Sequence, residues 1–502
     1  MTLIKQSDFI NSIADSLQFI ANYHSLDFIQ ALHQAYKKEK SPAAKEAIAQ
    51  ILVNSRMCAE SQRPICQDTG QVVAFIKVGM QVQWDGELTI QEMCDAGVRK
   101  AYLDKDNPLR ASMLSDPAGE RLNTKDNTPA VVHIEMVTGH CIEIAIAAKG
   151  GGSENKAKFT VLNPADSIVD WVLEMLPKMG AGWCPPGIIA LGIGGTAEKA
   201  MLCAKEALMA PIDIQQLQAR GAQNKIEALR LELYEKINQL GIGAQGLGGL
   251  TTVLDVKIKD YPTHAASLPI ALMPNCAATR HIEFSLNGEG AAVFTPPSLT
   301  DWPDISLTTE NARTVNLNQI TKQQISTWKV GETLLLSGKI LTGRDAAHKK
   351  IQALVEAGKP LPNGIDLKGR FIYYVGPVDA VRDEIVGPAG PTTATRMDSY
   401  SHLMLAELGL FGMIGKAERG SATCLEIKQQ GAVYLMAVGG AAYLVSKAIK
   451  ASKIMAFEEL GMEAIREFEI KDMPVTVAVD SQGVSIHKEG PKQWKIKISD
   501  IN

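Results

Sequence analysis

Apolar residues recur at helical spacing along the first sixty positions of the chain. One such set of apolar residues consists of Ile10, Ile13, Leu17 and Ile20, and a second lies within residues 28–36. Residues three or four positions apart lie on one face of an α-helix, so this pattern predicts amphipathic helices that pack on a core. Residues 215–238 carry a more charged version of the pattern, which predicts one long, solvent-facing helix without chemistry of its own.

The pattern changes after residue 71 to short apolar runs. The runs at 131–137, 142–147 and 188–193 predict buried strands. Helical patterns at 164–179 and 196–209 are interleaved with them. Strands that alternate with helices are typical of α/β layers, so the predicted fold class is α/β.

A change of composition divides the chain. Residues 287–318 include the stretch "FTPPSLTDWPDISL", which is rich in proline, threonine and aspartate and has little periodicity, as is typical of a linker. We therefore predict a helix-rich α/β N-terminal domain over residues 1–286 and a smaller α/β C-terminal domain over residues 319–502. Early in the second domain, "GETLLLSGKILTGRDAAHKKIQALVEAG" predicts a strand, a turn and a helix.

Composition and charge narrow the function classes. The 502 residues are 46% hydrophobic and 21% charged, which is typical of a globular protein with sizeable cores. A formal net charge of −4 gives no reason to expect binding to nucleic acid or to an acidic membrane surface. The apolar run 432–449 is interrupted by Gly439, Gly440 and Lys447, which favours a buried strand and helix over a membrane span.

The N-terminal stretch and the cysteine content both point to a reducing compartment. Asp8 and Asp15 come early, and neither a secretory signal nor an Arg-rich transit peptide fits the stretch that contains them. Eight cysteines without an export signal favour reduced thiols or metal ligands over a disulfide framework. We therefore predict a cytoplasmic protein.

Two glycine-rich segments resemble nucleotide-binding loops. The stretch "GIGAQG" at 241–246 matches the spacing of the dinucleotide fingerprint, but it follows a predicted helix and leads into a strand-like run. The fingerprint requires the opposite order, so this match is weak evidence for nucleotide binding. The stretch "LGIGGTAEKA" at 191–200 has strand, turn and helix in the right order but the wrong spacing, and predicts either an anion-binding turn or a tight connection.

Three of the cysteines differ from the rest in their surroundings. Cys66, Cys184 and Cys276 lie in the loop sequences "PICQDTG", "GWCPPG" and "PNCAATRH", each of which adjoins a strand-like run. The remaining five lie in apolar or helical patterns typical of buried thiols: Cys58, Cys94, Cys141, Cys203 and Cys424. The absence of close cysteine pairs argues against a structural zinc site. On spacing alone, three unrelated loop cysteines remain the favoured interpretation.

Several cations lie beside glycines or polar turns. They are Arg110, Lys149, Lys156, Arg344, Arg396 and Lys416. Arginine forks and exposed backbone amides bind carboxylates in a bidentate manner, so these positions are candidates for an acidic ligand. For any one of them taken alone, a surface charge or a helix cap is the simpler interpretation.

Taken together, these motifs resemble those of the class I fumarate hydratases, iron–sulfur dehydratases whose single chain fuses parts that other members carry as separate α and β subunits. The resemblance covers nearly the whole chain. Its most specific pieces are "PICQDTG", "AAKGGGSENK", "GWCPPGIIALGIGGTAEKA", "PNCAATRH", "LTGRDAAHK" and "GPAGPTTATRMD". The L-tartrate dehydratases and mesaconate hydratases share most of these motifs, so the resemblance is more specific for the family than for the substrate.

The resemblance implies a cofactor, a domain arrangement and an oligomeric state. It implies that Cys66, Cys184 and Cys276 hold three irons of a [4Fe-4S] cluster whose fourth iron is open to substrate. The N-terminal domain would bind this cluster, and a C-terminal domain of the swivelling type would close over it. The family is typically homodimeric, and the implied partner is a small dicarboxylate, with neither nucleic acid nor membrane.

The resemblance also implies residue roles for the conversion of (S)-malate to fumarate and water. Thr392 would take the C3 proton, and Asp68 with His264 as its partner would act on the hydroxyl side. Substrate-binding roles would fall to Gln67, Arg110, Gly151, Arg344, Arg396 and Lys416. A threonine hydroxyl is a poor base unless neighbouring cations lower its pKa, which makes the role of Thr392 chemically demanding.

Two interpretations outside this class remain at this point. The glycine loops could belong to an NAD-dependent oxidoreductase, which would bind the nicotinamide cofactor saturably. Alternatively, the cysteines could serve an iron-sensing binding protein, which would bind a macromolecular partner and turn over no dicarboxylate.

Overall fold

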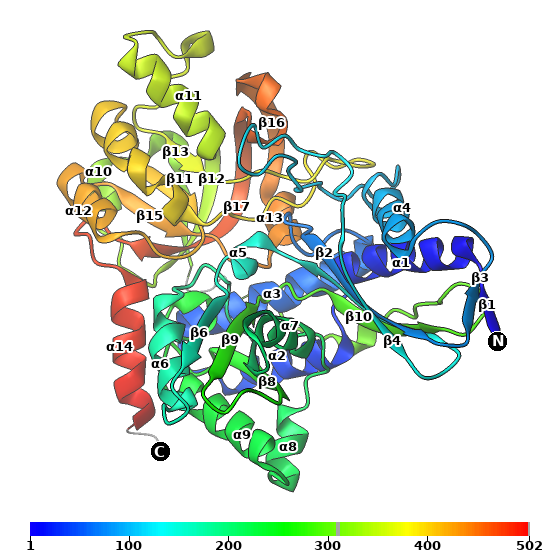
Figure 1. Cartoon of the computed structure of the whole chain (residues 1–502). Helices are drawn as coiled ribbons and strands as arrows, with labels where there is room; N and C mark the ends of the chain where they lie inside the picture. Colours follow the sequence, from blue (N-terminus) through cyan, green and yellow to red (C-terminus); the bar gives the residue numbers. More distant parts are fainter. Residues whose placement is uncertain (308–311, 500–502) are drawn as a thin grey trace.

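The protein consists of two α/β regions that meet along a broad interface (Figure 1). The computed structural model describes residues 1–307 and 312–499. In Figure 1 most of the N-terminal region, in blue to green, lies below the C-terminal region, in yellow to red, whose last helix reaches down beside it. The observed mixture of helices and sheets confirms the predicted α/β class.

Three helices confirm the helical pattern predicted for the first sixty residues: α1 (Gln6–Asn22), α2 (Leu26–Lys38) and α3 (Pro42–Ser61). A fourth helix, α4 (Ile90–Tyr102), follows the first strands and was not predicted. In the apolar stripe of α1, Ile13, Leu17 and Ile20 are buried and Ile10 is partly buried, and α1 packs against α4. The start of α4 is fixed by a capping box in which Thr89 and Glu92 each satisfy a backbone N–H of the other residue.

The first N-terminal sheet has the strand order β10-β5-β2-β4. Its strands are β2 (Gln71–Gly79), β4 (Val131–Val137), β5 (Ile142–Lys149) and β10 (His281–Leu286). Strand β2 is parallel to β4 and antiparallel to β5, and β5 is antiparallel to β10. A small pair, β1 (Thr2–Ile4) and β3 (Val82–Trp84), lies beside this sheet.

The second N-terminal sheet has the order β6-β9-β7-β8. Its strands are β6 (Lys158–Leu162), β7 (Gly187–Gly194), β8 (Val253–Tyr261) and β9 (Leu268–Asn275). The helices that accompany it are the short α5 (Gly151–Glu154), α6 (Ile168–Lys178), α7 (Ala197–Ala207), α8 (Ile214–Arg220) and α9 (Lys225–Asn238). The prediction of one helix over residues 215–238 is wrong, because Gly221 adopts a φ of +79° and separates α8 from α9.

The C-terminal region contains a small closed β-barrel. Strands β12 (Thr333–Thr342), β13 (Phe371–Tyr373), β14 (Gly412–Gly415), β15 (Val433–Met436) and β17 (Ile465–Val479) follow one another around it. Antiparallel pairing of β12 with β17 closes the barrel. The sheet is extended by β11 (Arg313–Asn316) and β16 (Ile449–Ala456), and the helices are α10 (Lys322–Ile325), α11 (Asp345–Glu356), α12 (Ser421–Gln430), α13 (Ala442–Ala448) and α14 (Ile486–Ser499).

The predicted linker over residues 287–318 is attached to both regions. Trp302 is buried, and its Nε1 donates a hydrogen bond to the Ser55 hydroxyl on α3 at 2.9 Å. Near its end, β11 pairs with β12 and therefore belongs to the C-terminal sheet. Residues 308–311 of this segment lie outside the described residues. The division into domains at these boundaries stays a prediction.

The glycines of the "GIGAQG" stretch serve helix packing. They lie between α9 and β8, and α14 of the C-terminal region packs against the 3₁₀ turn at Ala244–Gly246 within this stretch. A Cβ atom on Gly241 would lie 2.5 Å from the backbone nitrogen of Lys495, and one on Gly248, two residues after the stretch, would lie 2.5 Å from the carbonyl carbon of Gly490. The backbone of α14 therefore occupies the space beside these glycines, which removes the structural basis for an NAD-binding loop.

Among the described residues, no helix is both long and apolar enough to cross a bilayer. The apolar run 432–449 forms β15 and α13, as its pattern predicts.

A buried ion pair joins the two regions beside the first cysteine loop. Arg63, which is fully buried, contacts both carboxylate oxygens of Glu384, at 2.9 and 3.0 Å. The same guanidinium donates to Asn107 Oδ1 at 2.6 Å and to the carbonyl of Asp379 at 3.0 Å. Because a buried charge requires such complete pairing, Arg63 holds the N-terminal loop against the C-terminal region in one position.

The pair predicts a large effect of removing one partner. Arg63→Met leaves Glu384 buried without its counter-charge, and we expect a loss of about 3–5 kcal/mol in the free energy of unfolding. Arg56→Met is the matched control, because Arg56 pairs with Glu60 in an exposed bridge on α3 and should cost less than about 1 kcal/mol. Urea unfolding of both variants measures the difference. Equal losses would contradict the role of the buried pair.

Candidate active site

Strand pairing brings two of the three loop cysteines together. Cys184 lies just before β7, and Cys276 directly follows β9. Strands β7 and β9 are antiparallel, with Ile188 opposite Asn275, so the start of one lies beside the end of the other. The backbone N–H of Ala277 donates to the carbonyl of Cys184 at 3.1 Å and fixes the two loops to each other.

The first sheet delivers the third cysteine to the same place. Cys66 lies in the loop that enters β2, and Gln71 at the start of β2 pairs with Lys149 at the end of β5. Strand β10 begins at His281, five residues after Cys276, and also pairs with β5. The loops of all three cysteines therefore lie where strand ends of the two sheets meet.

The three thiols are buried or nearly so, and each lies within electrostatic range of the others. Burial raises the pKa of the Cys184 thiol to about 11, although Lys416 opposes that shift. Burial likewise raises the pKa of Cys66, against the charges of Arg280 and Lys416. Among the described residues, no three His, Cys, Asp or Glu side chains lie close enough together to bind a single metal ion.

The C-terminal region closes the cysteine site from the other side. The Nζ of Lys416, which follows β14, lies 3.1 Å from Cys184 Sγ. A Cβ atom on Gly439 would lie 2.4 Å from the same sulfur, so the backbone at this glycine touches the thiol. Gln245 connects the N-terminal and C-terminal sides of this site. Its amide donates to the Pro185 carbonyl at 3.0 Å, and its Oε1 accepts the Gly439 N–H at 2.9 Å.

Asp68 is held as a carboxylate next to the cysteines. Its Oδ2 accepts the backbone N–H of Gly151 at 2.8 Å, and its Oδ1 lies 4.0 Å from a guanidinium nitrogen of Arg110. Burial opposes ionisation, but Arg110, Arg280, Lys416 and the Gly151 N–H outweigh it and lower the pKa of the carboxyl group. Asp68 is therefore ionised at neutral pH and can accept a proton or a hydrogen bond.

Three arginines gather around a pocket of about 370 Å³ that Asp68 also lines. Arg110 comes from the N-terminal region, whereas Arg344 precedes α11 and Arg396 lies in a 3₁₀ turn of the C-terminal region. Burial and the neighbouring Arg110 lower the pKa of Arg344 to about 10. The pocket holds more positive than negative charge, because its lining carries four cations, Arg110, Lys149, Arg344 and Arg396, and three carboxylates, Asp68, Glu154 and Glu463.

The arginines also have unused hydrogen-bonding capacity. The Nε atoms of Arg110 and Arg344 are buried, and neither has a hydrogen-bond partner in the described part of the chain. Arg396 is 45% exposed and pairs with Asp345 at 2.5 Å, and Arg344 lies 3.4 Å from Glu463. Buried guanidinium donors without partners are satisfied when an anion enters the pocket.

Thr392, Lys416 and Gln67 are connected through the backbone of the C-terminal region. The N–H of Lys416 donates to the carbonyl of Thr392 at 3.0 Å, and the N–H of Thr392 donates to Tyr374 at 2.7 Å. The amide of Gln67 reaches across the interface and donates to the Pro391 carbonyl at 3.2 Å. Burial lowers the pKa of Lys416, but the three cysteine thiols outweigh it and raise that pKa overall.

His264 lies in a separate surface pocket. It is exposed on the turn between β8 and β9, where its Nδ1 accepts the N–H of Ala266, and its pocket is lined by Thr196, Lys199 and Tyr261. The residues that line the Asp68 pocket do not include it. A single chain therefore does not show the predicted partnership of His264 with Asp68, and that role stays a prediction without support from this arrangement.

Two further cations belong to the site: Arg280, which the sequence analysis did not single out, and Lys149, which it named as a candidate cation without a specific role. Arg280 is buried, its Nη1 has no partner among the described residues, and the charges of Cys66, Cys276 and Asp68 outweigh burial to raise its pKa. Lys149 lines the arginine pocket, and burial lowers its pKa to about 8. Both lie within motifs already noted, Arg280 in "PNCAATRH" and Lys149 in "AAKGGGSENK".

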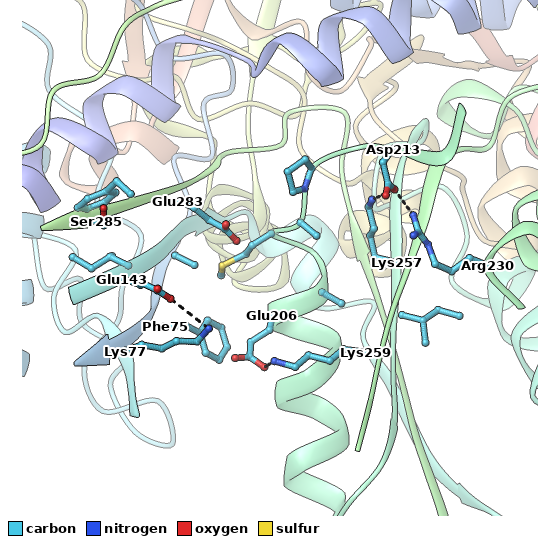
Figure 2. A pocket seen from close by; sticks show the side chains of 18 residues that line it. Phe75, Lys77, Glu143, Glu206, Asp213, Arg230, Lys257, Lys259, Glu283 and Ser285 are labelled. Atoms are coloured by element: carbon cyan, nitrogen blue, oxygen red, sulfur yellow. Dashed lines mark hydrogen bonds and ion pairs between the residues drawn. The ribbon is translucent and has the colours of Figure 1, made fainter. Parts of the chain in front are cut away.

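A larger pocket of about 720 Å³ lies elsewhere in the N-terminal region, between the two sheets (Figure 2). Its cations are paired with its own carboxylates: Lys77 with Glu143, Lys259 with Glu206, and Lys257 and Arg230 with Asp213. None of its lining residues is a cysteine. Neutralised charge of this kind offers less to an anionic substrate than the cations around Asp68, where the buried Nε atoms of Arg110 and Arg344 have no partner among the described residues.

An ionised carboxylate surrounded by surplus cations at the junction of two regions is the arrangement expected of an enzyme that acts on a small acid. Comparison with known proteins makes this more specific. Residues 10–285 match the family described as fumarate hydratase (Fumerase), and residues 288–490 match the family described as fumarase C-terminus. The chain belongs to the class I fumarate hydratase family, whose members are hydro-lyases.

Individual relatives agree with the family match. The chain is 33% identical over 506 residues to an anaerobic class I fumarate hydratase of Escherichia coli, covering 96% of this chain and 88% of the relative. It is 32% identical to a putative class I fumarate hydratase of Geobacillus stearothermophilus, with 95% of each chain covered. It is also 38% identical over 266 residues to a putative L(+)-tartrate dehydratase subunit alpha of Methanocaldococcus jannaschii, covering 52% of this chain and 91% of that protein.

Proposed function

We propose that the chain is a hydro-lyase that interconverts (S)-malate and fumarate. The observation that carries this proposal is the pocket in which ionised Asp68 lies among three incompletely paired arginines, next to the cysteine loops. A four-carbon dicarboxylate brings two negative charges, which match the surplus positive charge of the pocket. Family membership supports the same class of reaction.

We propose that Cys66, Cys184 and Cys276 hold a [4Fe-4S] cluster. The donor set fits this group, because three thiols from three loops share one buried site, where the cations Lys416 and Arg280 offset the negative charge of thiolates. Each thiol of such a cluster binds a different iron, so the sulfurs lie farther apart than the ligands of one ion. When bound, a cluster with three protein ligands supplies a Lewis-acidic iron that can bind a substrate hydroxyl and carboxylate.

The arginines, Gln67 and Lys416 would bind and orient the substrate. Arg110 and Arg344 offer buried Nε donors that have no partner among the described residues, and Arg396 adds a guanidinium from the rim of the pocket. A carboxylate held by such forks has a fixed orientation. The positive charge beside it also stabilises the negative charge that develops when a proton leaves the adjacent carbon.

Asp68 and Thr392 would handle the two proton transfers from opposite regions of the protein. In the hydration direction, the ionised carboxylate of Asp68 accepts a proton from the attacking water, and Thr392 supplies the proton to C3. In dehydration each transfer is reversed. Gly151 keeps Asp68 in place through its N–H, and the backbone N–H of Lys416 keeps Thr392 in place by donating to its carbonyl.

Variants of the C-terminal region test this division of roles. Arg396→Ala should lower kcat/KM for (S)-malate by about 10- to 100-fold with iron content unchanged, because it removes a charge-assisted contact to substrate. Arg313→Ala is the matched control, since Arg313 is 46% exposed and also forms one surface ion pair, with Glu332. Thr392→Val, a near-isosteric change, should lower kcat with little change in KM. Full activity of either site variant would remove that residue from the mechanism.

Substrate preference is the second test, because pocket shape alone separates the candidates. Mesaconate differs from fumarate by a methyl group and tartrate differs from malate by a hydroxyl group, and one methyl is worth only about 1–3 kcal/mol in a pocket. We expect the highest kcat/KM for fumarate and (S)-malate when the anaerobically reconstituted enzyme is assayed with all four acids. A clear preference for mesaconate or L-tartrate would overturn the substrate assignment but not the hydro-lyase chemistry.

A further inference from the structure

Strand β4 exposes apolar side chains at the edge of the first sheet. Val131 is 37% exposed, Ile134 is 51% exposed and Met136 is 58% exposed. Strand β4 pairs with β2 on one side, and no other strand of the described residues pairs with its outer side. A strand edge that combines free backbone groups with exposed apolar side chains tends to bind another strand, so native proteins usually cover or charge such edges.

The sequence of β4 is complementary to itself in antiparallel orientation. We infer that β4 pairs with β4 of a second copy of this chain, with the two-fold axis at Ile134. In that register Val131 lies opposite Val137, Val132 opposite Met136, His133 opposite Glu135, and Ile134 opposite its own counterpart. Apolar residues then meet apolar residues, and the imidazole of His133 lies where it can donate a hydrogen bond to the Glu135 carboxylate of the second copy.

Neighbouring registers are less favourable. A shift that centres the pairing on Glu135 places two glutamates directly opposite each other, and a shift that centres it on His133 places two histidines opposite each other and Glu135 opposite Val131. Centring the axis between residues 134 and 135 sets Glu135 against Ile134. Like charges or mismatched polarity in directly opposed pairs destabilise a sheet, so the Ile134-centred register is preferred.

The adjacent surface can extend the contact beyond the strand. His133 stacks on Phe75 with ring centroids 4.7 Å apart, and Phe75 lines the wide pocket of Figure 2. The pocket carries charges of both signs, including Lys77 and Glu143 on its rim. A stable interface buries roughly 1,600 Å², more than one strand pair provides, so the walls of this pocket are where the second copy would find the remaining area.

This surface uses none of the residues assigned to the chemistry, so the inference is independent of the proposed function. Ile134→Lys should convert a dimer of the wild-type chain into a monomer in light scattering coupled to gel filtration. Leu425→Lys is the matched control, because Leu425 is a 57% exposed apolar residue on α12 of the C-terminal region and should leave the dimer intact. A monomeric wild type, or a dimer that persists in Ile134→Lys, would overturn the inference.

Cross-linking tests the register itself. Directly opposed residues in antiparallel strands have Cα atoms about 4.5–5.5 Å apart, within the range of a disulfide. Ile134→Cys should therefore give a covalent dimer under mild oxidation, whereas Glu135→Cys should not, because its opposite residue in the second copy is His133. Wild-type protein, which contains Cys141 near this strand, controls for native thiols. A dimer band from Glu135→Cys but not from Ile134→Cys would reject the proposed register.

Discussion

The five residues 276–280 between β9 and β10 impose the constraint on which the site depends. A connection of this length spans at most about 20 Å, so the end of the second sheet must lie close to the start of the last strand of the first sheet. Pairing of β9 with β7 then places the Cys184 loop beside Cys276. Pairing of β10 with β5, and of β5 with β2, places the Cys66 loop and Gly151 there as well. The loops of Cys66, Cys184 and Cys276, which are far apart in the sequence, thereby lie at one place, where strand ends of the two sheets meet.

An excess of positive charge at this place allows it to bind an acidic ligand. The N-terminal region contributes Asp68, Arg110 and Arg280, and the C-terminal region adds Lys416 together with two further arginines. Burial lowers the pKa of Arg344, and repulsion from Arg110 lowers it further. An acidic substrate between the regions relieves this repulsion, so substrate binding and the contact between the two regions are expected to stabilise each other.

Much of the local structure was predictable from the sequence, because apolar spacing depends on short-range geometry. The early helices, the strands near residues 131–149 and the strand–turn–helix after residue 331 are present as predicted. The helix break at Gly221 was missed because apolar spacing continues through the glycine. Closure of the barrel by β12 and β17 joins residues more than 100 positions apart, which no local pattern records.

The sequence predicted most residues of the candidate site, but it did not predict how they are arranged in space. The loop cysteines stood out by their polar surroundings, but only the sheet register shows that they converge. Lys149 was named as a candidate cation, whereas Arg280 was missed, because its importance depends on burial and on neighbours from other loops. His264 illustrates the opposite case, because its motif predicts a role that the arrangement of one chain does not support.

The central claim is that three cysteines, and no others, bind the iron of this protein. Iron analysis of anaerobically reconstituted protein tests it directly when Cys66→Ala, Cys184→Ala and Cys276→Ala are compared with the wild type. Cys58→Ala is the sharpest control, because Cys58 is buried next to Cys66 but directs its thiol to the Pro64 carbonyl. The account predicts about four irons per chain in the wild type and in Cys58→Ala, and a large loss in each of the other three. Equal iron in all five proteins, or a loss confined to Cys58→Ala, would contradict it.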